Sequence, residues 1–597
     1  ALKAAKSKGW PVIKPSKNGA FDKLQRLRLD GTPVYYTIYN TAAARSTRAN
    51  FLHNGGGLGL NVEGQGMTAH VWDGGPTRPT HEDLTGRLTI NDGETVLNGN
   101  SFHAQHVTGT IAGTGLGNSA GRNSKGMAPK ANVLSHDWDN DLSEAAAEAI
   151  NGMLLSNHSY GAGIQNVPDW AFGAYTTQSQ AWDELMYNAP YYLMVAAAGN
   201  DGNTNNENGS PLQFNSAYDK LSGNKTSKNN MVVANGQDAT INANGTLSSV
   251  TRNTGSSEGP TDDFRIKPDI MGNGTQLFSA YDNSNSAYNT ISGTSMASPN
   301  ICGSMLLLQQ HYNNTNGNFM KAATLKGLTL HTADDTESTG PDANTGWGLM
   351  NTKVAAEAIN ENGLSSWISE ESLSESETFT MTVQSDGTSP LLASISWTDP
   401  VTGGYVNITG AINDGTSTLV NDLDIRVTQA SNTYYPWRLT GVSSNTNANG
   451  TDNTVDPYER VDVNGASGVY TITVTHKGSL YSGKQNFSLV VTGLSSDIAL
   501  ANKSGNQIIC SNNDATFNFD YKQIGGGTSN ISANNVPAGA NVNFTQNSFS
   551  ADGNFDVIFS NLNAVAPGNH VVEIIADNGN ETEVRNIELT VYHNTFA

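Results

Sequence analysis

Cysteine and long apolar runs are the features that this 597-residue sequence has least of. Its two cysteines, Cys302 and Cys510, lie in stretches that we assign to different domains, so no disulfide is expected between them. Their scarcity is weak evidence about the redox compartment. No apolar run approaches the ~18 residues that a membrane-spanning helix requires. The sequence therefore predicts neither a disulfide scaffold nor a membrane span.

Charge is also sparse, and most of it has one sign. Charged residues make up 14% of the chain, and 54 acidic against 32 basic residues give a net charge of −22. A nucleic-acid-binding surface needs clustered positive charge, so general nucleic-acid binding is not expected. The acidic balance is typical of a secreted protein that tolerates salt. It also favours bound calcium, which takes oxygen ligands.

The N-terminus departs from this balance. Residues 1–28 contain a single acid, Asp22, and eight basic residues: Lys3, Lys6, Lys8, Lys14, Lys17, Lys23, Arg26 and Arg28. We interpret residues 1–46 as a basic arm or a propeptide remnant. An anion-binding element is the alternative.

Glycine is abundant, and the order of apolar segments predicts the fold class. The 62 glycines, with many Asn, Ser and Thr residues, predict frequent turns. Up to about residue 362, short apolar runs such as 192–197 and 231–234 alternate with helix-like segments such as 142–155. This alternation predicts an α/β domain at 47–362, with a parallel sheet flanked by helices on both faces.

From about residue 363 the pattern changes to strands with a period of two residues. Residues 468–474 and 485–491 are examples. We predict two all-β sandwich domains, the first at 363–496 and an immunoglobulin-like one at 497–597. Such a fold does not by itself decide between a spacer and a binding module.

Ser295 is the strongest candidate for a reactive group. It lies between small residues in the stretch 293–299 (Gly-Thr-Ser-Met-Ala-Ser-Pro), just before the apolar run 301–308. At the start of a helix, the dipole favours nearby negative charge and the serine amide is free to donate to an oxyanion. A serine hydroxyl still needs a base and a group that orients the base.

Two upstream segments supply these groups. Asp73 ends the apolar run 69–72 and precedes two glycines, and His103 and His106 open the segment 103–113. The three segments, in the order Asp, His, Ser, resemble the boxes of the subtilases, the subtilisin-like serine proteases. The resemblance implies that Ser295 is the nucleophile, His103 the base and Asp73 the orienting carboxylate. We interpret His106 as a residue of the helix face that packs inside the domain. Ala104 and Gln105 stand where the family usually has Gly-Thr.

A fourth segment resembles the subtilase oxyanion strand. Residues 195–202 run from small apolar residues into Gly199 and Asn200, which alone would indicate an ordinary turn. The resemblance implies that the Asn200 side-chain amide and the Ser295 amide stabilise the tetrahedral intermediate.

Residues 155–161 resemble the strand that pairs with an extended peptide substrate in this family. The resemblance implies two pocket walls for the residue before the scissile bond. Their candidate residues are Ser159, Tyr160 and Gly161 on one wall, and Ala197, Ala198 and Gly199 on the other. All are small or uncharged, so we expect an apolar or aromatic preference.

The first β domain resembles the jelly-roll domain that follows the protease in one branch of bacterial alkaline subtilases. The motifs are Trp-Thr-Asp-Pro at 397–400 and Asn-Asp-Leu-Asp at 421–424. Asp399, Asp422 and Asp424 are candidate ligands for a structural Ca²⁺, with turn capping as the alternative. No organic cofactor is expected.

The combined prediction is a secreted serine endopeptidase that acts on proteins or peptides through an acyl-enzyme. We expect a monomer with broad specificity and a neutral-to-alkaline optimum. No signal peptide is visible at Ala1, so export is inferred from the enzyme class. One alternative is a catalytically impaired subtilase that acts as an adhesin or binding protein. Another is a sedolisin-type acid protease, which His103 and Asn200 oppose because that class uses a glutamate base and an oxyanion aspartate.

Overall fold

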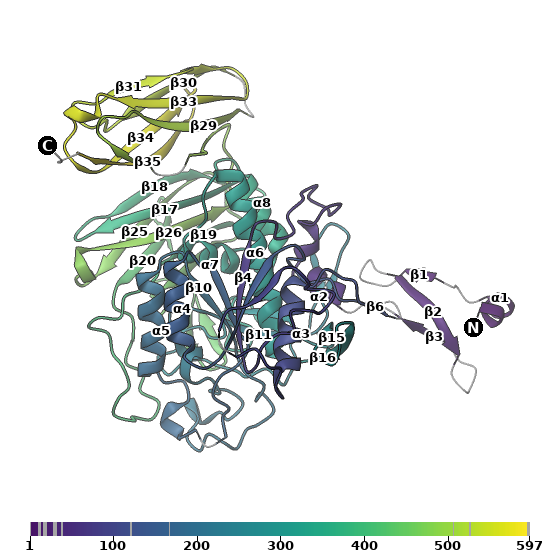
Figure 1. The fold of residues 1–597 in the computed structure, drawn as a ribbon. Coiled ribbons are helices and arrows are strands. Elements are labelled where there is room, and N and C mark those ends of the chain that lie inside the picture. Colours follow the sequence, from purple (N-terminus) through teal and green to yellow (C-terminus); the bar gives the residue numbers. More distant parts are fainter. Residues whose placement is uncertain are drawn as a thin grey trace.

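The computed structural model describes residues 2–9, 13–15, 21–27, 33–36, 40–92, 94–119, 122–165, 167–504, 507–523 and 527–593. Figure 1 shows an α/β domain followed by β domains, with the last strands, in yellow, at one end of the molecule. The predicted fold class is confirmed. The four domain boundaries given above stay predictions.

A seven-stranded parallel sheet forms the centre of the α/β domain. Its order is β14-β11-β10-β9-β4-β8-β5, and every neighbouring pair is parallel. The strands are β4 (Thr68–Asp73), β5 (Leu88–Ile90), β8 (Asn132–Asp137), β9 (Leu155–His158), β10 (Leu193–Ala197), β11 (Met231–Gly236) and β14 (Ile270–Asn273). The strand order reverses between β9 and β4, because β9, β10, β11 and β14 follow one another on one side and β8 and β5 lie on the other.

Helices cover both faces of this sheet. Successive strand residues point to opposite faces, and Val71 packs in one core while its neighbour Trp72 packs in another. The Val71 core contains side chains from α3 (Ser101–Ala112) and α6 (Thr294–Asn316), and the Trp72 core those from α4 (Asp141–Ile150) and α5 (Thr177–Asn188). The strands are therefore apolar on both sides, as a parallel sheet requires.

Helix α6 is buried along most of its length. All its residues from Thr294 to His311 are buried, and it packs against α3 and against β9, β10, β11 and β14. Three further helices are α2 (Asn40–Ser46), α7 (Ala322–His331) and α8 (Thr352–Asn360). Within the described part of the chain, none of the helices has the length and apolar character needed to cross a membrane.

Two β-sandwiches follow α8. In the first, one antiparallel sheet contains β17 (Ser366–Ser374), β26 (Lys484–Thr492), β19 (Leu391–Ser396) and β24 (Tyr458–Val463). The other contains β18 (Phe379–Gln384), β25 (Val469–Lys477), β20 (Asp422–Gln429) and β21 (Asn432–Tyr434). The apolar side chains of the two sheets form one buried core.

The second sandwich has a separate apolar core. One sheet contains β27 (Ile498–Asn502), β29 (Ala515–Gln523), β33 (Gly553–Ser560) and β31 (Asn541–Phe544). The other contains β28 (Gln507–Cys510), β35 (Thr582–Tyr592), β34 (Gly568–Asp577), β30 (Ser529–Asn534) and β32 (Ser548–Phe549), with β28 parallel to β35.

The described residues also form smaller elements. The two-stranded sheets are β6 (Asn118–Ser119) with β7 (Arg122–Asn123), β12 (Thr240–Ile241) with β13 (Leu247–Ser249), β15 (Leu277–Tyr281) with β16 (Ala287–Ile291), and β22 (Arg438–Gly441) with β23 (Ser444–Thr446). The basic N-terminus contains α1 (Leu2–Lys8) and an antiparallel sheet of β1 (Ile13–Pro15), β2 (Phe21–Leu27) and β3 (Pro33–Tyr36).

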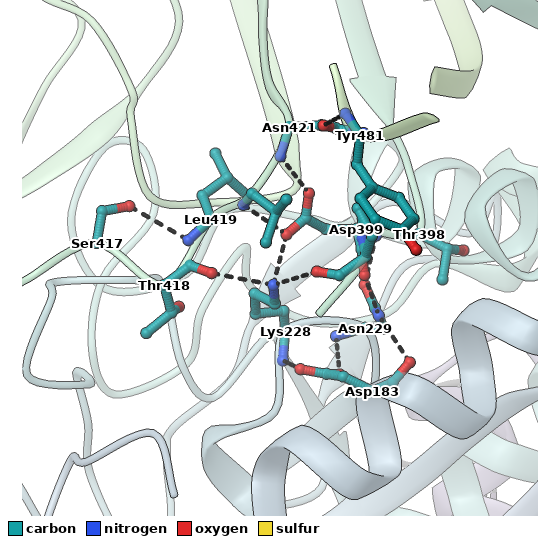
Figure 2. Close-up of polar contacts among 12 residues, drawn as sticks. Asp183, Lys228, Asn229, Thr398, Asp399, Ser417, Thr418, Leu419, Asn421 and Tyr481 are labelled. Carbon is teal, nitrogen blue, oxygen red and sulfur yellow. Dashed lines mark hydrogen bonds and ion pairs between the residues drawn. The ribbon is translucent and has the colours of Figure 1, made fainter. Parts of the chain in front are cut away.

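Lys228 and Asp399 form a buried ion pair between the α/β domain and the first sandwich (Figure 2). Neither side chain is exposed. Lys228 Nζ also donates to the carbonyl oxygens of Pro400 and Thr418, at 2.8 and 3.0 Å. Asp399 accepts the backbone amides of Val420 and Asn421, each at 2.9 Å. Both charges are thus fully satisfied, which compensates the cost of desolvating them.

Replacing Lys228 with Met should destabilise this junction strongly. The change leaves the Asp399 carboxylate buried without its cation, which typically costs about 3–5 kcal/mol. Chemical denaturation would measure the loss in the free energy of unfolding, taken from the transition that occurs at the lowest denaturant concentration. The control is Lys353→Met, which removes a more exposed helical pair with Glu357 and should cost less than about 1 kcal/mol. Equal losses in the two variants would contradict the role of the buried pair.

Candidate active site

The reversal of strand order places two functional segments side by side. In open α/β sheets, ligands bind beyond the carboxyl ends of the strands, at the point where the order reverses. Here Asp73 is the last residue of β4, and Ser159 directly follows the neighbouring strand β9. The candidate site therefore lies where the topology alone predicts a site.

Asp73 and His103 are in direct contact. His103 lies in the first turn of α3, and its Nδ1 is 2.8 and 2.9 Å from the two Asp73 carboxylate oxygens. Asp73 is 2% exposed and also accepts the Gly74 amide at 2.7 Å, which fixes the carboxylate. The His103 side chain is 23% exposed, so its other ring nitrogen is not sealed inside the protein. This geometry suits an orienting carboxylate and a base.

The surroundings of the two histidines in the segment 103–113 shift their pKa values in opposite directions. Burial lowers the pKa of His103, but the Asp73 charge and hydrogen bond outweigh it, and the net effect raises the pKa above its ordinary value. Burial lowers the pKa of His106 to about 3. His106 is fully buried, with Nε2 3.0 Å from the Leu277 carbonyl oxygen. His106 is therefore a neutral core residue, whereas His103 titrates.

The Ala104-Gln105 departure leaves the Asp73–His103 contact intact. Both residues are fully buried, and Gln105 Oε1 accepts the Arg78 amide at 2.7 Å. The Gln105 side-chain oxygen thus accepts a hydrogen bond from the backbone.

Ser295 lies in the first turn of α6, next to the segment that follows β9. Its Oγ donates to the Ser159 carbonyl oxygen at 3.0 Å, and Ser159 Oγ donates back to the Ser295 carbonyl oxygen at 2.9 Å. Pro299 explains the second bond, because it has no amide to give to the carbonyl four residues earlier. Among the described residues, no hydrogen bond joins Ser295 Oγ to His103. Catalytic hydrogen bonds are often loose without substrate, so this arrangement is compatible with a triad.

Asn200 is held with its amide nitrogen available. Its Oδ1 accepts the Thr294 amide at 2.8 Å and the Thr294 hydroxyl at 3.0 Å, which determines the orientation of the side chain. Within the described ranges, Asn200 Nδ2 has no protein acceptor. The Ser295 amide, in the first turn of α6, has no intrahelical acceptor either. The structure thus provides two donors beside Ser295, as an oxyanion site needs.

The six predicted pocket residues lie at or directly after the carboxyl ends of two neighbouring strands. β9 and β10 are paired, so the segments 159–161 and 197–199 both leave the same edge of the sheet. Ser159, Ala197 and Ala198 are buried. Tyr160 donates its hydroxyl to Asp141 at 2.8 Å.

A residue that sequence reasoning missed lies between these two segments. A Cβ atom placed on Gly161 would be 3.3 Å from Lys225 Nζ, and one placed on Gly199 would also be 3.3 Å from it. In the sequence, Lys225 stands in a polar stretch with a second lysine three residues on and has no periodic pattern, so nothing marks it as buried.

The three candidate calcium ligands are all paired with lysines. Asp399 binds Lys228, while Asp422 and Asp424 contact Lys477 at 3.4 and 2.7 Å. Two other groups have geometry compatible with a cation: Asp92, His136 and Glu144, and Asp424, Asp452 and Glu459. In the second group, Arg426 and Lys477 already pair with Asp424 and Asp452. Bound calcium therefore stays a prediction without an assigned set of ligands.

Comparison with known proteins identifies the α/β domain. The model of the subtilase family matches residues 64–348. These residues form a subtilase domain. The family is that of the subtilisin-like serine proteases, so the resemblance found in the sequence is confirmed for this domain. The branch with a C-terminal jelly roll stays a prediction.

Several fungal and bacterial proteases are similar to the subtilase domain. Alkaline protease 1 of Aspergillus flavus is 30% identical over 256 residues, which are 41% of this chain and 52% of that protein. Subtilisin DY of Bacillus licheniformis is 25% identical over 282 residues, which are 47% of this chain and 86% of that protein. The self-cleaved protease domain of PatA, a solved structure, has 21% identity and a TM-score of 0.38, covering 50% of this chain and 99% of its own. The chain spans about half the length of the first fungal relative.

The Asp73–His103 contact should be visible in a titration. We expect the His103 pKa to lie above the ordinary histidine value in the wild type and to fall in Asp73→Asn, because the carboxylate stabilises the protonated ring. NMR of ring-labelled histidine, assigned with His103→Gln, would measure both. His106 is the internal control and should stay neutral down to about pH 3–4. An unchanged His103 pKa in Asp73→Asn would contradict the assigned contact.

Proposed function

We propose that the protein is a secreted serine endopeptidase that cleaves proteins through an acyl-enzyme. The observation that carries the proposal is the Asp73–His103 pair, which lies where the strand order of the sheet reverses, with Ser295 at the start of the buried helix α6. The family of the domain and its protease relatives support the same activity.

Catalysis starts with a change of partner for Ser295. Its hydroxyl leaves the Ser159 carbonyl oxygen and donates to Nε2 of His103, the ring nitrogen that does not contact Asp73. His103 accepts the proton as Ser295 Oγ attacks the peptide carbonyl. Asp73 stabilises the imidazolium. Asn200 Nδ2 and the Ser295 amide donate to the oxyanion. His103 then protonates the leaving amine, and water repeats the sequence on the acyl-enzyme.

We propose a neutral-to-alkaline pH optimum for the activity, and the direction of this pH dependence follows from His103. Only the neutral imidazole accepts a proton, so activity is lost as pH falls through the His103 pKa. Because the Asp73 carboxylate raises that pKa, the loss begins at a higher pH than for an unperturbed histidine. A sedolisin-like acid optimum is thus disfavoured. We also propose a secreted monomer, on the strength of the enzyme class.

A second candidate function is an impaired subtilase that acts as a binding protein. The Ser295–Ser159 hydrogen bond favours it, since the nucleophile is not bonded to its base. The two sandwiches would then be the functional part.

Cleavage of casein by wild type and Ser295→Ala separates these functions. We expect the variant to lose at least about 10⁴-fold in rate while its circular dichroism stays unchanged, because the remaining groups cannot replace the nucleophile. Ser304→Ala, which removes a hydroxyl farther along the same helix, is the matched control and should keep the wild-type rate. Equal activity of wild type and Ser295→Ala, or none in the folded wild type, would overturn the proposal.

A further inference from the structure

Lys225 lies between the two segments that are expected to receive the substrate side chain. It belongs to the 3-10 helix η4 (Gly223–Thr226), and it is 4% exposed. A Cβ on Gly161 would lie 2.8 Å from its Cε, so the lysine side chain packs directly against this glycine. A Cβ on Gly199 would lie 3.3 Å from its Nζ. The ammonium therefore lies against both walls.

Its charge is poorly compensated, in contrast to the other buried lysines. Among the described residues, four more lysines are as buried, and each pairs with a carboxylate: Lys220 with Glu258 at 3.0 Å, Lys228 with Asp399, Lys267 with Asp269 at 2.6 Å and Lys326 with Asp269 at 3.2 Å. Lys225 Nζ forms no ion pair with any residue that the structure describes. It donates one hydrogen bond, to the Ala162 carbonyl oxygen at 3.2 Å.

Two of the three donors of the Lys225 ammonium have no acceptor among the described residues. An ammonium carries three donors, and a buried, unpaired one is costly. Burial lowers the Lys225 pKa, and the nearby Asp201 carboxylate offsets only part of that effect. A carboxylate that entered between Gly161 and Gly199 would supply the missing partner.

We propose that Lys225 is a specificity-determining residue and that the protease prefers an acidic side chain before the scissile bond. The inference rests on the proposed endopeptidase function, and it replaces the apolar or aromatic preference expected from the uncharged pocket walls. A glutamate or aspartate carboxylate makes a charge-assisted hydrogen bond with Nζ. A neutral or apolar side chain would bury the ammonium without a partner, which a site built for a polar group rejects strongly.

The test is a series of fluorogenic peptides that differ only in the residue before the cut: Glu, Gln, Ala and Phe. Wild type should cleave the Glu peptide with a kcat/KM about 10- to 100-fold above that of the Gln peptide, which has the same shape without the charge. Lys225→Met should lose this ratio and gain on the Phe peptide. Lys353→Met, which removes a lysine from α8, should keep the wild-type ratios.

The outcomes separate the inference from the function on which it rests. Equal Glu and Gln rates in wild type, or a Glu preference that survives in Lys225→Met, would overturn the role of Lys225 while leaving the protease intact. A wild-type preference for Ala would overturn it too, because the lysine would then only fill the pocket. No cleavage of any peptide or of casein would instead overturn the endopeptidase. Gain on Phe in Lys225→Met shows that the variant is folded.

Discussion

The burial of helix α6 is the constraint on which the candidate site depends. Its residues from Thr294 to His311 are closed in by the central sheet and α3, so the helix cannot shift without opening the core. This fixes Ser295 beside the carboxyl ends of the strands. Asp73 is held by the same sheet, and α3 brings His103 to it. Three groups far apart in sequence are thus positioned by one packed core.

Much of this could be predicted from sequence because the signals are local. Apolar strands such as 192–197 that alternate with helical segments predicted a parallel sheet, and the strand order confirms it. The segments around Asp73, His103 and Ser295 carried their own chemistry. The hydrogen bond from Ser295 to Ser159 was beyond reach, because it depends on a contact between residues 136 positions apart.

Buried lysines were the main feature that sequence could not reveal. Lys225 and Lys228 stand in the same polar stretch and would be expected in solvent. The fold buries both and gives them different surroundings: Lys228 meets Asp399 of the following sandwich, while Lys225 meets two glycines and a carbonyl. The pairing of one lysine and the isolation of the other arise only from tertiary structure. The role of a buried charge in this chain therefore has to be inferred from the groups that surround it.

The central claim is that Ser295 is a nucleophile activated by His103. The most direct measurement is labelling of the folded protein with a serine-directed fluorophosphonate, followed by mass spectrometry of the modified peptide. The account predicts one label, on Ser295, in the wild type and none in His103→Ala, since the reagent reacts with a serine whose proton a base accepts. No label on the wild type, a label on another residue, or undiminished labelling of His103→Ala would contradict it.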